Sequence, residues 1–225
     1  MHPRQPVHAA AAPGRRTYAG AVPLDKPETF GATEFQLVLL RRMADYQPEL
    51  VEDARVRLGA SVTQMREANA QWQRMSRGRY SRGALSQVRS ALGAPAAAGE
   101  RRLGDLLCRA EQWVLPLWPD LRFEAVAGPD GALFNQGFVR APGAAAPALR
   151  SLADLAPWSC VVGDLEAAFG PVRYLEGSAP SRMGALVRAD DGAGVKIGVL
   201  ATFVWGLLQQ AGPAAAANSG PGPLH

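Results

Sequence analysis

The sequence has no histidine in the part that is expected to fold. Its three histidines are His2, His8 and His225, at the two ends of the chain. Histidine is the usual general base, the usual partner of a catalytic thiol and the commonest metal ligand. Their positions argue against histidine-dependent catalysis, and we expect no metal and no cofactor, although an all-carboxylate metal site fits the composition.

Cysteines, long apolar runs and enzyme motifs are also scarce. The two cysteines, Cys108 and Cys160, are too few for a disulfide framework or a cysteine-rich zinc site. The most apolar run, Ile197 to Leu208, is shorter than the roughly 20 residues that span a bilayer. Phosphate-binding loops, dinucleotide-binding glycine motifs, Gly-x-Ser-x-Gly and Cys-x-x-Cys are absent. Because the first residues also lack an apolar signal region, we expect a cytoplasmic bacterial protein with no transmembrane segment.

Lysine is rare, and the positive charge is concentrated in the middle of the chain. Lys26 and Lys196 are the two lysines, so 22 of the 24 basic residues are arginines. Residues 54–110 carry 11 basic and 3 acidic side chains, whereas the segments before and after them are net negative. This asymmetry indicates a polyanion or an acidic protein surface as partner, although blocks of charge often only keep a helix face solvated.

The patterning predicts an α+β protein. We expect an N-terminal helical hairpin or bundle of about four helices, followed by a small α+β region with two β-hairpin-like units and two or three helices. The expected regions are a disordered proline-rich arm at 1–29, a basic helical region at 30–118, an acidic α+β region at 119–212 and a disordered tail at 213–225.

Four helices are expected in the basic region. The first begins at Thr33 in a capping box, and the second runs from 48 to about 75 on a seven-residue apolar repeat. Gly59 lies inside this repeat and weakens the helix by about 1 kcal/mol relative to alanine. The third begins at Ser81, and the fourth spans about 100–118 on a stripe of leucines.

Strands and helices are expected to mix after residue 118. Gly128-Pro129-Asp130-Gly131 is a strong turn signal between two apolar runs. The expected strands are 121–126, 132–139, 172–175, 183–189 and 195–200. The expected helices are 149–155, 157–169 and 201–210.

The candidate binding site is the basic turn near residue 78 and the helix that follows it. A long helix, a turn containing glycine and a short helix with serine, glutamine and arginine side chains fit a helix-turn-helix. Arginine and glutamine contact base edges and phosphates, and a tyrosine stacks on bases, whereas Trp72 keeps the apolar repeat and is expected in the core. The candidates for polyanion or partner binding are Arg74, Arg77, Arg79, Tyr80, Arg82, Gln87 and Arg89.

The nucleophilic and acidic residues favour structural roles. Cys160 lies near an expected helix start, which lowers a thiol pKa, but without a histidine base a buried structural thiol is favoured. Cys108 is interpreted in the same way. Asp164 and Glu166 do not share a helix face. The remaining candidates are Asp190 and Asp191 in an expected turn and Lys196 on a strand, where a solvent-facing position is favoured.

Three functions remain open. The first is a non-catalytic interaction or accessory protein that binds an acidic partner through its arginine-rich helical region. The second is a helix-turn-helix-like nucleic-acid-binding regulator that uses residues 72–92. The third is an enzyme with a carboxylate- or cysteine-based site in the C-terminal half. The missing catalytic inventory favours the first.

Overall fold

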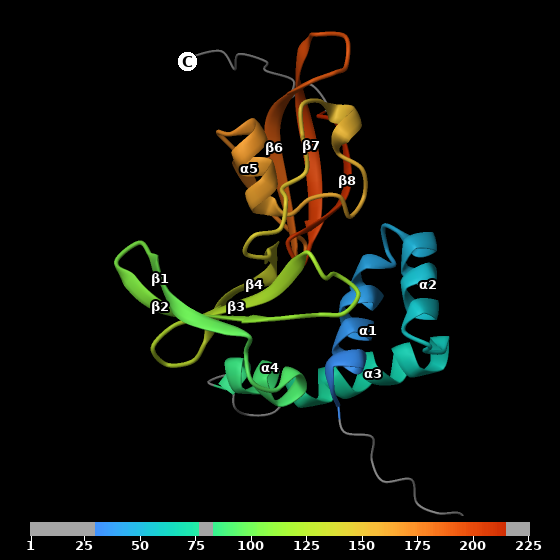
Figure 1. The fold of residues 1–225 in the computed structure, drawn as a ribbon, viewed down its shortest axis with the longest axis vertical. Coiled ribbons are helices and arrows are strands. Elements are labelled where there is room, and N and C mark those ends of the chain that lie inside the picture. Colours follow the sequence, from blue (N-terminus) through green and yellow to red (C-terminus); the bar gives the residue numbers. More distant parts are fainter. Residues whose placement is uncertain (1–29, 77–82, 215–225) are drawn as a thin grey trace, which may run out of the picture.

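The computed structural model describes residues 30–76 and 83–214 of the chain. These residues form five α-helices and two four-stranded antiparallel sheets, which confirms a mixed α+β fold. Figure 1 shows the sheets one above the other, with most helices around the lower one. The disordered arm predicted at 1–29 lies outside the described residues. So does the tail predicted at 213–225, except for residues 213 and 214, and the last strand ends at residue 213.

Four helices come first in the chain. Their bounds are α1 (Ala32–Met43), α2 (Pro48–Arg57), α3 (Val62–Ser76) and α4 (Ala84–Leu92). Helix α1 is the most buried of them, since seven of its twelve residues have little or no exposed surface. Its Phe35 lies edge-on to both Trp72 of α3 and Phe123 of the lower sheet, so Trp72, half-buried, packs against the core, where it was predicted.

The single long helix predicted for 48–75 is wrong. The chain turns between α2 and α3, where Gly59 has φ +66, a left-handed conformation that glycine adopts without strain. The Ser61 hydroxyl then accepts a hydrogen bond from the Gln64 amide, and the Gln64 side chain accepts one from the Ser61 amide. This reciprocal cap begins a new helix and outweighs the continuous apolar repeat.

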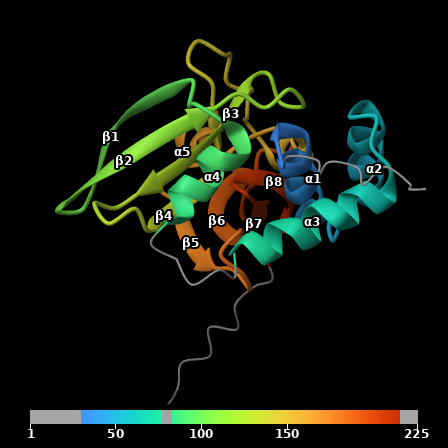
Figure 2. The same ribbon diagram turned by 90° about the horizontal axis from the view of Figure 1, so that it is seen from below.

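The first helix also begins earlier than predicted. The N-cap is Gly31 rather than Thr33, because the Glu34 carboxylate accepts a hydrogen bond of 2.8 Å from the Gly31 amide. The third helix is confirmed as α4, whereas its predicted cap, Ser81, lies outside the described residues. Figure 2 shows α4 lying across the lower sheet from below.

The lower sheet, sheet A, contains the largest correction. It consists of β1 (Ala97–Leu103), β2 (Leu106–Trp113), β3 (Leu121–Ala127) and β4 (Leu133–Arg140), paired in that order. The helix predicted for 100–118 is therefore wrong, and the boundary drawn at residue 118 falls between two strands of one sheet. The Gly104-Asp105 turn, with Gly104 at φ +59, makes a hairpin of this segment. Leu103, Leu106 and Leu107 of the supposed helical stripe lie at the turn end of this hairpin.

The upper sheet, sheet B, holds the C-terminal residues. It pairs β5 (Arg173–Glu176), β6 (Arg182–Asp190), β7 (Lys196–Val204) and β8 (Leu207–Pro213) in that order. The strands predicted at 172–175, 183–189 and 195–200 are confirmed as β5, β6 and β7, and those predicted at 121–126 and 132–139 are confirmed as β3 and β4 of sheet A. The helix predicted for 201–210 is wrong, because β7 continues and a two-residue turn at Trp205-Gly206 leads into β8.

The two helices predicted between the sheets are shorter than expected. Helix α5 (Val162–Phe169) replaces the helix predicted from 157, because the Asp164 carboxylate accepts a hydrogen bond from the Val161 amide and caps the start there. The helix predicted for 149–155 is a single 3-10 turn, η2 (Leu152–Asp154).

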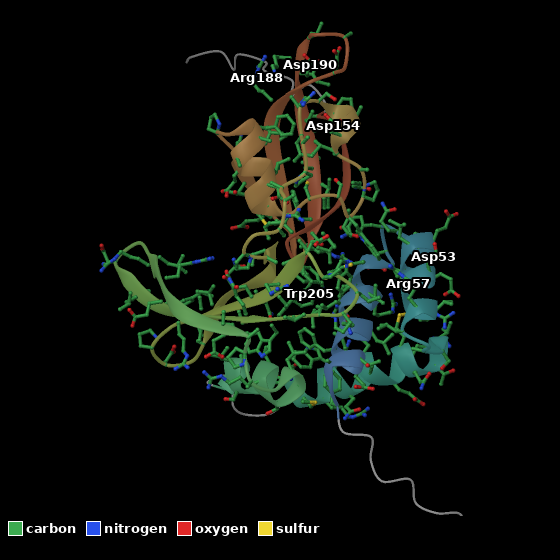
Figure 3. All side chains as sticks on the ribbon, in the orientation of Figure 1. Asp53, Arg57, Asp154, Arg188, Asp190 and Trp205 are labelled. Atoms are coloured by element: carbon green, nitrogen blue, oxygen red, sulfur yellow. The ribbon has the colours of Figure 1, made fainter. Side chains whose placement is uncertain are left out.

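The Trp205-Gly206 turn joins the two sheets. Trp205, labelled in Figure 3, packs near Phe123 in the core of sheet A, and the Phe138 amide donates a 2.6 Å hydrogen bond to its carbonyl oxygen. Trp205 has φ 52, an unfavourable conformation for a large side chain. Burial of its indole in the other sheet's core offsets that cost. Sheet B also has a core of its own, which includes Phe203.

Candidate functional site

The structure describes three of the seven predicted binding residues. Arg74 is exposed at the end of α3. Gln87 donates a 3.0 Å hydrogen bond to the Ser76 hydroxyl and so links α4 to the end of α3. Arg89 points toward sheet A and forms an ion pair there. The other four, Arg77, Arg79, Tyr80 and Arg82, lie outside the described residues.

Arg89 is bound to a buried carboxylate. Its Nε donates a 2.7 Å hydrogen bond to Glu111 of β2, a second nitrogen donates to the other oxygen, and Arg109 donates to the same group. The Glu111 side chain is fully buried, and Arg89, more than Arg109, holds its pKa below the ordinary value against the opposing effect of burial. Arg89 therefore fastens α4 to the sheet and is not a free polyanion ligand.

A second buried acid fixes the opposite face of sheet A. Glu124 of β3 accepts hydrogen bonds from Arg101 of β1, at 2.6 and 3.1 Å, and one of 2.8 Å from Gln112 of β2. Because Gln112 lies opposite Glu124 in the register and follows Glu111, the two acids point to opposite faces. The two ion-pair groups tie the hairpin formed by β1 and β2 to the body of the protein.

Sequence reasoning missed both acids because it placed β1 and β2 in a helix. Once 106–113 is read as a strand, Glu111 alternates with Trp113 on the face toward α4, which is the signal for an inward carboxylate. A buried acid then requires a basic partner. The arginines that provide it belong to the same charge block that suggested polyanion binding.

The outer end of this hairpin is the most exposed part of sheet A. Every residue of β1 is exposed, and β1 is the edge strand of the sheet. Figure 1 shows β1 and β2 extending away from the helices and from sheet B. Three large apolar side chains near the turn are 39–49% exposed: Leu103, Leu106 and Leu107. Phe134 of β4, 52% exposed, lies against Gly128 at the same end of the sheet.

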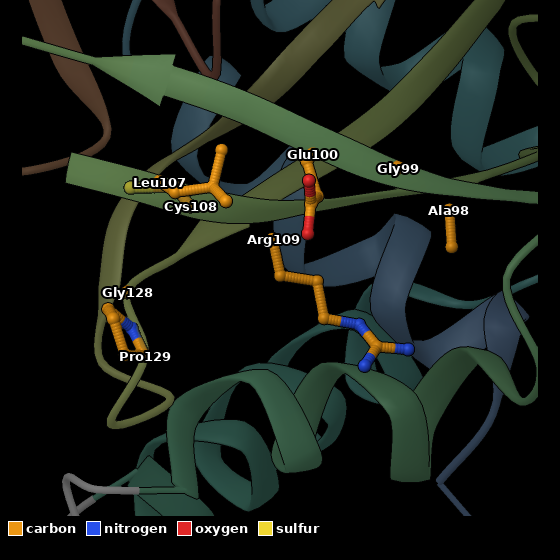
Figure 4. Close-up of a pocket in the computed structure, with 8 residues that line it drawn as sticks. All are labelled: Ala98, Gly99, Glu100, Leu107, Cys108, Arg109, Gly128 and Pro129. Atoms are coloured by element: carbon orange, nitrogen blue, oxygen red, sulfur yellow. The ribbon is translucent and has the colours of Figure 1, made fainter.

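A cavity of about 430 Å³ lies beneath the hairpin (Figure 4). It is lined by β1, β2 and the turn at Gly128-Pro129. Its charged side chains are Glu100 and Arg109, which lie opposite each other in the register, and Arg109 is already paired with Glu111. The cavity therefore contains no pair of free acid and base groups suited to proton transfer.

A second cavity, of about 750 Å³, lies at the edge of sheet B. Arg173, Arg188 and Lys196 surround a lining that is otherwise mainly apolar. Lys196 is exposed, as predicted, and lies opposite Asp190. Asp190 and Asp191 accept backbone hydrogen bonds within the turn that follows them, which confirms the structural role expected for both.

The cysteines and remaining acids are engaged in the fold. Cys160 is fully buried, and burial raises the pKa of its thiol to about 11, so the reactive thiolate is scarce at neutral pH. Cys108 is also buried. Asp164 pairs with Arg140, and Glu166 accepts a hydrogen bond from a tyrosine hydroxyl.

Residues 30–76 and 83–214 offer neither a grouped set of metal ligands nor a membrane-spanning helix. Within them, no three histidine, cysteine or acidic side chains are grouped to hold a metal ion. None of the helices in this part of the chain combines the length and apolar character that crossing a membrane requires. No family model, no curated protein and no solved structure matches the chain.

Proposed function

We propose that this is a non-catalytic interaction protein that binds its partner through the β1–β2 hairpin. One observation carries the proposal: β1 is an edge strand with both faces exposed along all seven residues, beside an exposed apolar end. An unpaired strand edge presents backbone donors and acceptors to any extended segment that reaches it. Clustered apolar side chains on a surface also mark binding sites, whereas scattered ones do not.

The edge lacks most of the features that block strand pairing. β1 contains no proline, pairs with β2 without a register shift and has seven residues, against seven or eight in the strands behind it. It does carry charge, at Glu100, Arg101 and Arg102, which discourages unselective pairing. Arg101, however, is held by Glu124, and the other two have opposite signs. This pattern selects a partner of complementary charge.

The hairpin is held in its exposed conformation before any partner binds. Arg101 fastens β1 to β3, and Arg109 and Arg89 converge on Glu111 beneath β2. A surface that is already ordered loses little conformational entropy on binding. The buried acids of sheet A therefore support binding by the hairpin.

Binding of an acidic partner or of nucleic acid through residues 72–92 stays a prediction. Arg89 is engaged with Glu111. Binding through this segment would therefore depend on Arg74, Arg77, Arg79 and Arg82. A salt titration of binding to labelled duplex DNA and single-stranded RNA decides it. Steep salt dependence that is lost when Arg77, Arg79 and Arg82 are replaced by alanine would establish that surface.

Site-specific photo-crosslinking tests the hairpin directly. A photoreactive amino acid replaces Leu106 at the end of the hairpin, and in a matched variant it replaces Val195, an exposed residue of the turn between β6 and β7. In the cells that make the protein, we expect a discrete crosslinked product from position 106 and none from position 195. No product, or the same products from both positions, would overturn the proposal.

A further inference from the structure

We infer that the segment bound by β1 is β1 of a second copy of this chain, so that two sheets A join into one eight-stranded antiparallel sheet. The inference rests on the proposed function, since it names the partner of the same edge. Its basis is charge: the residues whose backbone groups face outward along β1 include one acid and one base, so two copies of the strand can set opposite charges against each other.

The turn determines which backbone groups of β1 are free. Leu103 and Leu106 flank a two-residue turn, so these two residues form a hydrogen-bonded pair. In an antiparallel ladder, alternate residues bond to one neighbour and the residues between them face the other way. Ala98, Glu100 and Arg102 therefore direct their N–H and C=O groups away from β2, toward the free edge.

Charge selects one alignment of two such edges. Residues whose backbone groups face outward pair only with residues of the same kind in the second copy. In a symmetric pair, one residue of β1 therefore lies opposite its own counterpart, and the two-fold axis passes between these two. An axis at Glu100 sets two acids opposite each other, and an axis at Arg102 sets two arginines opposite each other. An axis at Gly99 places Glu100 opposite Ala98. With the axis at Arg101, Glu100 lies opposite Arg102 of the second copy, twice, and both pairs are attractive.

Glu100 and Arg102 are both available for pairing with a second copy. Within the described part of the chain, Glu100 and Arg102 have no ion-pair partner, whereas their neighbour Arg101 does. The two Arg101 side chains meet at the axis, where like charges are unfavourable. Each is bound in two places to its own Glu124, which offsets its charge and draws it toward β3.

The apolar end and the shape of the molecule fit this alignment. Leu103, 39% exposed, lies opposite Gly99 of the second copy, where no side chain blocks it, and gains a covered position. Figure 1 and Figure 2 show the outer edge of β1 clear of the helices and of sheet B. Because the paired strands run in opposite directions, the two bodies lie at opposite ends of the joined hairpins.

Sedimentation velocity of the full chain tests the alignment by exchanging its charges. The wild type is run from about 1 to 500 µM, the range that a small interface requires, beside E100R, R102E and E100R/R102E. The wild type is expected to dimerise as concentration rises. Each single exchange sets like charges opposite each other twice and weakens the dimer by about tenfold or more. The double exchange restores opposite charges and is expected to return dimerisation to within about threefold of wild type.

Controls distinguish loss of self-pairing from loss of the fold. They also distinguish a failure of self-pairing from a failure of partner binding by the hairpin. E176R makes the same charge change on an exposed residue of β5 and is expected to leave dimerisation unchanged. Far-UV circular dichroism of each variant shows whether it is folded. A wild type that stays monomeric, or a folded double exchange without recovery, would overturn the self-pairing. A crosslink from position 106 to a protein other than this chain, instead of a product of twice 23.8 kDa, would overturn it while leaving the proposed function standing.

Discussion

Replacing Arg89 by alanine tests whether one ion pair holds α4 against sheet A. The change leaves the fully buried Glu111 carboxylate with Arg109 as its remaining basic partner. Removing one member of a buried pair costs about 3–5 kcal/mol. Arg109 stays in place and Arg89 is 40% exposed, so we expect a smaller loss of about 2–3 kcal/mol in the free energy of unfolding.

Urea denaturation at pH 7 followed by tryptophan fluorescence measures this loss. In dilute protein, where the chain is monomeric, Arg102→Ala is the matched control, because it removes an exposed arginine with no ion pair among the described residues, and it is expected to cost about 0.5 kcal/mol or less. Replacing Arg89 and Glu111 together by leucine removes the unpaired charge and is expected to recover much of the loss. If Arg89→Ala is no more harmful than Arg102→Ala, then Arg89 does not fasten α4, and its role as a free ligand is open again.

Two buried side chains and one closely packed glycine provide further tests. Because the pKa of Glu111 is lowered in the folded protein, its contribution to stability is complete above the ordinary carboxyl pKa and is lost as pH falls through the lowered value. Wild type should thus lose more stability than Glu111→Gln between about pH 5 and pH 2 in urea titrations, and equal losses would contradict this. Gly137→Ala places a Cβ 2.7 Å from the Trp205 carbonyl oxygen and should cost about 1–3 kcal/mol by thermal or urea unfolding, unlike Gly212→Ala, whose Cβ meets nothing within 4 Å. Cys160, fully buried with its pKa raised to about 11, should react with a thiol reagent only as fast as the protein opens, and rapid labelling would refute this.

Strands with turn signals and alternating burial were predictable from the sequence. The Gly128–Gly131 turn and the strands on either side follow from local chemistry, because a Pro-Asp-Gly turn stops any helix. The short helix α4 was predictable for the same kind of reason, since its apolar residues fall on one face. Where a turn residue and the apolar spacing agreed, the structure followed them.

The errors arose where the spacing of apolar residues fits both the period of a helix and the period of a strand. Leu103, Leu106 and Leu107 fit a helical stripe, yet two of them flank the Gly104-Asp105 turn of a hairpin. The run from 197 to 208 forms two strands on either side of a turn whose first residue is a tryptophan at positive φ, which no local preference favours. Contacts with the other sheet determine that conformation, so the sequence near the turn does not reveal it.

The candidate site was hidden by the same ambiguity. A helix at 100–118 has no free edge, so β1 did not emerge as a binding element. The arginines that drew attention to residues 54–110 include Arg89, Arg101 and Arg109, which are paired with Glu111 or Glu124. Charge counted along a sequence does not distinguish arginines that neutralise buried acids from arginines that face a partner.

Amide hydrogen exchange resolved along β1 tests the central claim most directly. In dilute protein, the amides of Gly99 and Arg101 bond to β2 and are expected to exchange slowly, while those of Glu100 and Arg102 face the free edge and exchange quickly. Raising the protein concentration should slow Glu100 and Arg102 and leave the other two unchanged. The account is contradicted if the amides of Glu100 and Arg102 already exchange slowly in the dilute monomer. It is also contradicted if they exchange quickly at every protein concentration and in the presence of every partner that crosslinking identifies, since β1 is then not the edge through which this protein binds.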